Sequence, residues 1–126
     1  MSFPFFPPFK TRTVDAATTS TGSQLLTCVV PARGKLVSAQ LSIGYNQSQT
    51  AAATVDFALH AGALGAAAGT TPSTISGMGG QSVTTTTAAT FLFTPTTATY
   101  VNQGDVLVLS STGTCCPQVM WVIQEF

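Results

Sequence analysis

The sequence predicts an all-β protein: a jelly-roll-like antiparallel β-sandwich of about eight short strands, with an extended N-terminal arm. Three observations support this class. Short apolar, β-branched runs recur along the chain, separated by turn-forming residues. No stretch has the apolar spacing of a convincing helix. The N-terminus concentrates proline, which is excluded from central strands. We therefore expect an arm and polar linker over residues 1–23 and a sandwich domain over residues 24–126.

Residues 1–9 contain four phenylalanines and three prolines. Proline removes backbone donors and favours an extended, polyproline-like chain. Four rings would be costly to leave in water, so this segment is interpreted as an arm that docks on a neighbouring molecule. The alternative is an arm that folds back over its own sheet. The docking side chains are expected to be Phe3, Phe5, Phe6 and Phe9.

The first strand is expected over residues 24–30, which are apolar on both faces. Residues 35–45 alternate between apolar and polar side chains and predict a half-buried strand, and residues 54–60 alternate in the same way. Residues 61–81 are rich in Gly, Ala and Ser, and they predict a long loop. Further short strands are expected at residues 90–94 and 98–101.

Two apolar runs near the C-terminus, residues 106–109 and 119–123, predict strands that are apolar on both faces. A small domain has one core, so the second face of such strands needs another cover. In a jelly roll the first strand lies beside the last, which would place residues 24–30 next to residues 118–126. We expect an oligomer interface that includes Val106, Val108, Met120 and Val122.

Charge is scarce in this sequence: 6% of residues are charged and the formal net charge is zero. Without a basic patch, nucleic acid is not an expected partner. A nearly neutral surface favours association, so the expected partner is the protein itself. No apolar stretch is long enough for a membrane span, and the N-terminus lacks the pattern of a signal peptide. Synthesis in the cytoplasm of the producing cell is expected.

Candidate catalytic residues are few. His60 and Asp56 share one face of a predicted strand, but no nucleophile motif accompanies them, so no enzyme is expected. No metal or other cofactor is expected either. The odd number of cysteines (Cys28, Cys115 and Cys116) argues against a disulfide framework. The single tryptophan, Trp121, is interpreted as a core or interface residue, with a sugar-binding platform as the alternative.

Several motifs over residues 24–126 resemble one known family. They are a VP-x-x-G turn at residues 30–34, a Gly/Ala/Thr-rich middle, a V-x-x-GD-x-L-x-L element at residues 101–109 and a hydrophobic terminal strand. In this pattern the chain resembles the head decoration, or cement, proteins of tailed bacteriophages. The GD-x-L element is also similar to one in trimeric jelly rolls of the complement and tumour-necrosis-factor type.

The resemblance implies a structural protein on the capsid exterior of a virion, made in the host cytoplasm. It implies a homotrimer that binds the major capsid protein and holds the shell against internal pressure. The alternative function is a receptor- or glycan-binding head on the virion surface, which would use the loop at residues 61–81 and outward aromatic side chains.

Overall fold

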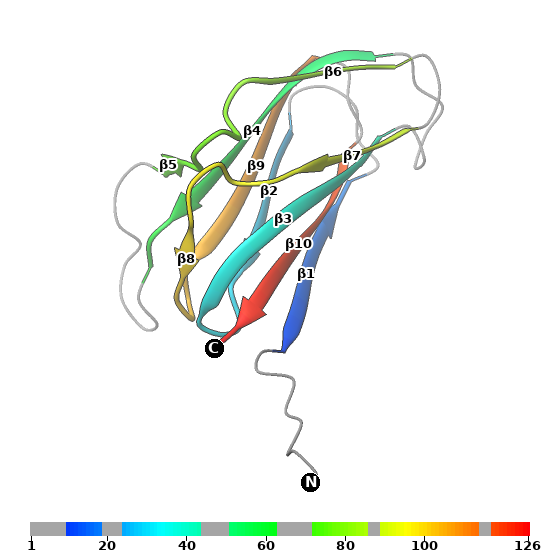
Figure 1. Ribbon diagram of the computed structural model, residues 1–126. Coiled ribbons are helices and arrows are strands. Elements are labelled where there is room, and N and C mark those ends of the chain that lie inside the picture. The colour runs from blue at the N-terminus through cyan, green and yellow to red at the C-terminus, as the bar shows by residue number, and fades with distance from the viewer. Residues whose placement is uncertain (1–9, 19–23, 44–50, 63–71, 86–88, 114–116) are drawn as a thin grey trace, which may run out of the picture.

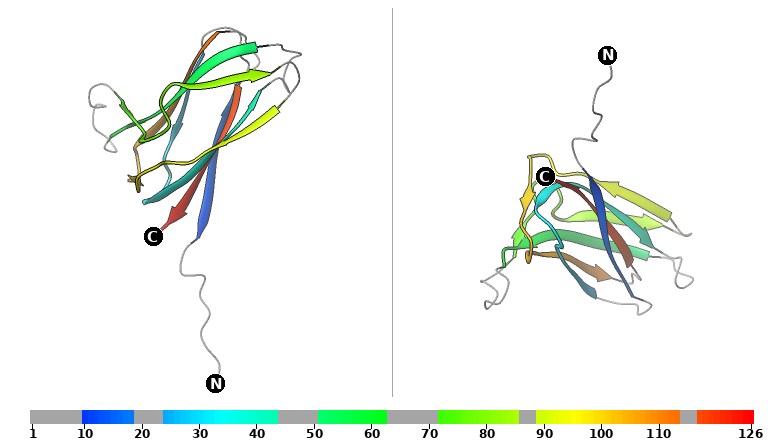
Figure 2. Two further views of the ribbon diagram at one scale, coloured as in Figure 1. Left: turned by 45° about the horizontal axis from the view of Figure 1, so that its top comes forward. Right: turned by 90° about the horizontal axis from the view of Figure 1, so that it is seen from below.

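Two antiparallel sheets packed face to face form the protein in a computed structural model, which describes residues 10–18, 24–43, 51–62, 72–85, 89–113 and 117–126 (Figure 1). Throughout these ranges every regular element is a strand. A view along the strands shows the two sheets as separate layers (Figure 2). The structure therefore confirms the predicted all-β sandwich.

Each sheet has a central four-strand path with one further short strand at its side. Sheet A follows the order β1, β10, β3, β7, and β8 pairs with the other end of β3. Its strands are β1 (Thr11–Ala17), β10 (Pro117–Glu125), β3 (Gly34–Ile43), β7 (Ala89–Phe93) and β8 (Tyr100–Val101). Sheet B follows the order β2, β9, β4, β5, and β6 also pairs with β4. Its strands are β2 (Gln24–Val29), β9 (Val106–Gly113), β4 (Ala51–His60), β5 (Ser73–Thr74) and β6 (Gln81–Thr85).

The expected pairing of residues 24–30 with residues 118–126 is wrong. Strand β2 pairs with β9, so Val29 lies opposite Val106, whereas β10 lies between β1 and β3 in the other sheet. The first described strand does lie beside the last, but that first strand is β1.

Strand β1 lies within the stretch that was expected to be a polar linker. All seven of its residues pair with β10, from Thr11 opposite Gln124 to Ala17 opposite Gln118. Val14 and Ala16 pack against the core, and the residues between them face outward. An edge strand needs only one apolar face, so two small side chains are enough to hold it. The sandwich therefore begins at Thr11 and not at Gln24.

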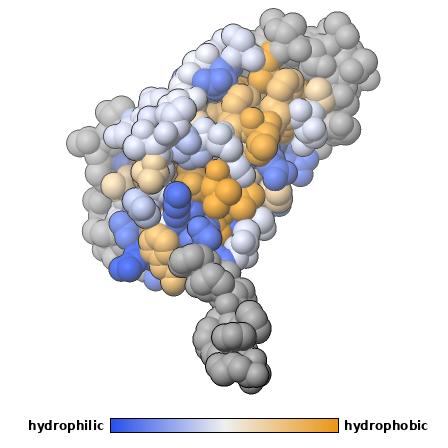
Figure 3. Space-filling model, viewed as in Figure 1, coloured by the Kyte–Doolittle hydropathy of each residue, from blue (hydrophilic) through white to orange (hydrophobic). Residues whose placement is uncertain are grey.

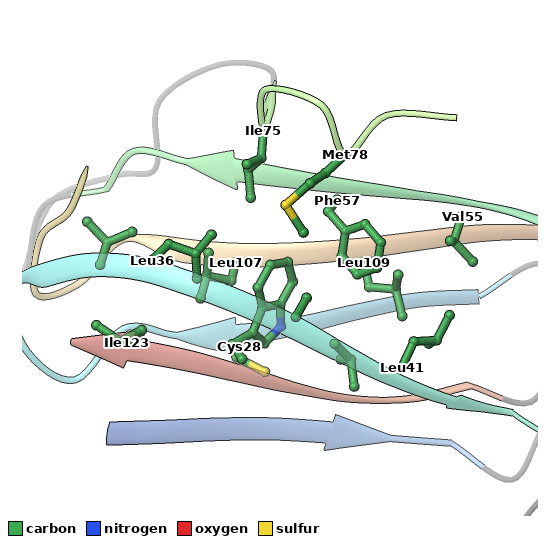
Figure 4. Packing of buried hydrophobic residues seen from close by; sticks show 14 of the residues in the cluster. Cys28, Leu36, Leu41, Val55, Phe57, Ile75, Met78, Leu107, Leu109 and Ile123 are labelled. Atoms are coloured by element: carbon green, nitrogen blue, oxygen red, sulfur yellow. The ribbon is translucent and has the colours of Figure 1, made fainter. Parts of the chain in front are cut away.

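The core fills the space between the sheets with alternate side chains from each strand (Figure 4). Trp121 of β10 is fully buried and meets Phe57 of β4 edge to face, with ring centroids 5.4 Å apart. Phe57 also packs against Phe93 at 5.0 Å. Aromatic pairs in these arrangements gain energy beyond their buried area. The inward alternation of Leu107 and Leu109 follows the pattern that the sequence predicted.

Part of the predicted loop at residues 61–81 packs on the sandwich. Ile75 and Met78 are buried, and both point toward the core beside Phe57 (Figure 4). The Ile75 amide donates to the Phe57 carbonyl at 2.9 Å, and the Phe57 amide donates to the Met78 carbonyl at 3.2 Å. Residues 75–78 therefore act as a plug along one side of the sandwich.

Two predictions lie outside the described residues. The expected docking arm (Phe3, Phe5, Phe6 and Phe9) precedes residue 10, and the adjacent cysteines Cys115 and Cys116 fall between β9 and β10. Residues 63–71 of the predicted loop are also outside these ranges.

Candidate interaction surfaces

The four predicted interface residues lie on two opposite faces of the molecule. Val106 and Val108 belong to β9 and face outward from sheet B, because Leu107 and Leu109 fill the core. Met120 and Val122 belong to β10 and face outward from sheet A, where the core is filled by Trp121 and its neighbours. The structure thus separates the predicted interface into two surfaces that no single contact can cover.

The outer face of sheet B carries several apolar side chains, and those on its edge strand are the most exposed. The side chains of Leu25 and Val29 on edge strand β2 are 67% and 61% exposed. Val29 pairs with Val106, and Ala58 of β4 pairs with Val108 on the other side of β9. Leu25 pairs with Ser110, and Thr27 lies between Leu25 and Val29 and pairs with Val108, which is only 7% exposed. Polar residues therefore interrupt the apolar side chains of this face. We call these apolar side chains the sheet B patch: Leu25, Val29, Ala58, Val106 and Val108.

The outer face of sheet A is also mixed. Met120 lies between Asp15 of β1 and Gln40 of β3, and Val122 lies between Thr13 and Ser38. Figure 3, which looks onto this face, shows apolar areas interrupted by polar ones. Sheet A also carries exposed apolar side chains, Val37 at 43% and Leu92 at 64%, so both outer faces are candidates for a hydrophobic contact.

The exposed side chains of β2 were missed as interface residues. The sequence did predict that residues 24–30 are apolar on both faces, and that property is the signal that could have identified Leu25 and Val29. Assigning them to a surface required the pairing of β2 with β9, and strand pairing over such a distance along the chain has no local sequence signal.

The start of β9 shows what the GD-x-L element does in this chain. The Asp105 carboxylate is buried and accepts hydrogen bonds from the amides of Asn102 at 2.9 Å and Gly62 at 3.1 Å. The Gly104 amide donates to the Val30 carbonyl at 2.9 Å, and the Val30 amide donates to the Asp105 carbonyl at 2.8 Å. Gly104 has a φ of 92°, a conformation that favours glycine. The element therefore joins three separate segments at one end of the sandwich, which is a structural role.

The residues considered for catalysis do not form a reactive group. Asp56 accepts a hydrogen bond from the Gly80 amide at 2.6 Å, which holds the segment that follows Met78. His60 lies four residues along the same strand, opposite Val106. Nowhere in the described ranges do three or more His, Cys, Asp or Glu side chains gather in a way that could hold a metal ion.

Trp121 is a core residue, and its burial rules out the alternative of a sugar-binding platform. Cys28 is also buried, at the β2 side of the core. Burial raises the pKa of the Cys28 thiol, and the negative charge of Asp15 raises it further. A thiol in this state is a weak nucleophile, because the thiolate is the reactive form.

Two shallow grooves lie on the outer face of sheet A. The larger, of about 420 Å³, lies between the start of β3 and the connection from β7 to β8, and it is lined by Lys35, Leu36, Val37, Pro95, Thr96, Thr97, Ala98 and Gln124. The smaller, of about 360 Å³, is lined by Gln40, Ser42, Thr90, Phe91 and Leu92. Val37 reaches the first groove because a bulge in the pairing of β3 with β10 leaves it without a partner opposite.

Comparisons of the chain with protein-family models, with curated proteins and with solved structures find no match. The described part of the chain contains no helix that is long and apolar enough to cross a membrane. Function must therefore be inferred from the surfaces themselves.

Proposed function

We propose that this protein is a structural, non-enzymatic component of a bacteriophage virion, a decoration or cement protein on the capsid exterior. In this role it self-associates, as a homotrimer, through the sheet B patch and binds the major capsid protein to stabilise the shell. The observation that carries the proposal is the exposure of Leu25 and Val29 in the sheet B patch, on a protein with 6% charged residues. We also infer a jelly roll, because successive strands alternate between the sheets for much of the chain and β1 lies beside β10.

The sheet B patch is apolar enough to drive association. Burying an exposed side chain of the size of Leu25 or Val29 contributes roughly 1.5–3 kcal/mol. Two such residues on each subunit, with Val106 beside them, give a gross contribution of several kcal/mol per subunit before the cost of lost freedom is subtracted. Self-association through sheet B would cover this surface and leave sheet A free for other contacts.

The N-terminal arm supplies the second contact of the proposal. Its phenylalanines, Phe3, Phe5, Phe6 and Phe9, are the side chains that would bury apolar area on the shell. Residue 10 tethers the arm at the end of the sandwich where β1 begins. A trimer would present three arms at once, so their binding would gain from avidity.

The test removes the protein from purified virions of the producing phage and then adds it back. Shells without the protein are expected to lose their contents at lower temperature or lower osmotic stress, and the added protein should restore resistance. Host adsorption is measured on the same samples. Shells of unchanged stability with impaired adsorption would overturn the cement role and support a receptor-binding head instead.

A further inference from the structure

All four basic side chains of the chain lie at one end of the sandwich, which we call the basic end. Lys10 and Arg12 lie at the start of β1, and Arg33 and Lys35 flank the first residue of β3. The register places these segments side by side, since Thr11 pairs with Gln124 and Gln124 pairs with Lys35. At the other end of these strands the paired residues are uncharged: Ala17 pairs with Gln118, and Gln118 pairs with Ser42. The protein has no net charge, but its positively charged side chains are all at one end of the sandwich.

The acidic groups near the basic end do not cancel its charge. Glu125 accepts two hydrogen bonds from Arg12, at 3.1 and 3.2 Å, and so neutralises that guanidinium. The Asp105 carboxylate is buried and is occupied by backbone amides. Within the described residues, neither Arg33 nor Lys35 forms an ion pair with an Asp or Glu side chain. Lys10 forms none with such a described side chain either, so three basic side chains, Lys10, Arg33 and Lys35, are left for a partner.

Exposed aromatic rings lie beside these charges. Tyr100 and Phe126 are each 58% exposed, and their ring centroids are 5.7 Å apart. The Arg33 guanidinium lies 5.9 Å from the centre of the Phe126 ring, within the range of a cation–π contact. Tyr, Phe and Arg are enriched at the centres of protein–protein interfaces. The composition of this corner is therefore that of a protein-binding surface.

A groove continues from this corner along sheet A. Lys35 pairs with Tyr100 in the sheet and also lines the larger groove, together with Val37 and Pro95. Figure 3 shows hydrophilic residues at this end of the face and an apolar area beside them. A partner lying here would meet positive charge first and an apolar floor next to it.

From these observations we propose that the basic end, with Arg33, Lys35, Tyr100 and Phe126, binds an acidic segment of a partner protein laid along the larger groove. This inference rests on the proposed function, in which the segment belongs to the capsid shell. Charge complementarity selects acidic partners, and the exposed rings favour a protein over a polyanion without apolar groups. So few cations give little affinity for nucleic acid, which releases counterions in proportion to the phosphates contacted.

The experiment measures binding of the full chain to shells from which the protein has been stripped, at about 50 and about 500 mM NaCl, because salt screens such contacts. The double variant Arg33→Gln, Lys35→Gln is expected to bind roughly tenfold or more weakly than wild type at low salt. At high salt the two proteins should bind almost equally. Tyr100→Ala is expected to weaken binding at both salt concentrations.

The matched control is Thr90→Glu with Gln118→Glu, which makes the same change in net charge at the far end of the same face. Both positions are exposed, and they are expected to leave binding unchanged. Melting temperatures confirm that every variant is folded.

If wild type fails to bind stripped shells, the proposed function fails. If wild type binds but the double variant and the control bind alike, the basic end is not the docking surface. Equal affinity of wild type for a DNA fragment and for shells would also overturn this inference.

Discussion

Asp105 shows how one charged side chain can organise an end of a sandwich. Its carboxylate accepts hydrogen bonds from backbone amides of two different segments, and its backbone carbonyl accepts one from the amide of Val30 in a third. A buried carboxylate is costly unless its oxygens are occupied, and here each oxygen accepts one amide. The GD-x-L pattern in the sequence is therefore explained by hydrogen bonding within the subunit, and it requires no ligand.

Asp105→Ala is expected to lower the free energy of unfolding by about 2–4 kcal/mol, because two partly buried amides lose a charged acceptor. Asp105→Asn keeps one acceptor oxygen and should lose about half as much. Urea unfolding of the purified variants measures both values. Asp15→Ala removes an exposed carboxylate and serves as the control, with an expected change within about 0.5 kcal/mol. Equal losses for Asp105→Ala and Asp15→Ala would contradict this role.

The buried thiol of Cys28 predicts a loss of stability at alkaline pH. Its pKa is raised above the ordinary value of 9.0, so the folded protein keeps this proton to a higher pH than the unfolded chain does. Above pH 9 the unfolded chain therefore binds fewer protons, and the free energy of unfolding falls as pH rises, by up to about 1.4 kcal/mol per pH unit. Below that pH this contribution is fully present.

Cys28→Ala removes this titration. The difference between wild type and Cys28→Ala in free energy of unfolding should be constant from pH 7 to about 8.5 and should shrink above about pH 9. Other groups titrate equally in both proteins and cancel in the comparison. Parallel curves up to pH 10.5 would show that burial does not perturb the thiol.

Among the strands, β1 differs most from its prediction. Its sequence is polar and rich in threonine, and only Val14 and Ala16 face the core. These two side chains are weak evidence of a strand when read alone, because a polar linker contains such residues as often. Their role as core residues becomes evident only from the pairing of β1 with β10, in which Val14 lies opposite Trp121 and Ala16 lies opposite Val119.

Two truncations separate the arm from strand β1. Removing residues 1–9 is expected to leave the melting temperature within about 2 °C of wild type, because the first described backbone contact, from the Glu125 amide to the Lys10 carbonyl, is kept. Removing residues 1–17 deletes seven paired residues and uncovers the edge of β10, and it should lower the melting temperature by about 10 °C or more. A large loss for the shorter truncation would show that the arm folds back over its own sheet.

At the scale of the whole molecule, the two outer faces make different predictions for self-association. Val29→Asp places a charge in the sheet B patch, whereas Leu92→Asp places one on the outer face of sheet A. Both side chains are exposed, so neither change should unfold a subunit. Sedimentation at micromolar concentration should show that Val29→Asp dissociates the oligomer and that Leu92→Asp does not. The opposite result would assign the interface to sheet A, and a wild-type monomer at every concentration would remove the basis for an interface.

Alternation along each strand allowed the sequence to predict the sandwich, the core positions of β9, β10 and the second half of β3, and the existence of apolar outer faces. In the first half of β3 the expected inward residue Val37 is exposed and Leu36 is buried instead, because of the bulge opposite β10. Alternation could not predict which strands pair, because β2 and β9 are far apart in the chain and share no local signal. For the same reason the predicted interface combined Val108 with Val122, which lie on opposite faces. The plug formed by Ile75 and Met78 was hidden by the glycine and serine residues around it.

The pairing of β1 with β10 also has a mechanical meaning. Tension applied to residue 10 along the axis of β1 acts parallel to this strand while the body of the sandwich resists. All the hydrogen bonds between β1 and β10 are then loaded together in shear. Tension between residue 10 and the C-terminal residues, which lie side by side, would instead open the same bonds one after another. Single-molecule pulling in these two directions should give a higher rupture force for the first, and a tether loaded in that way suits a protein that must hold its position under pressure.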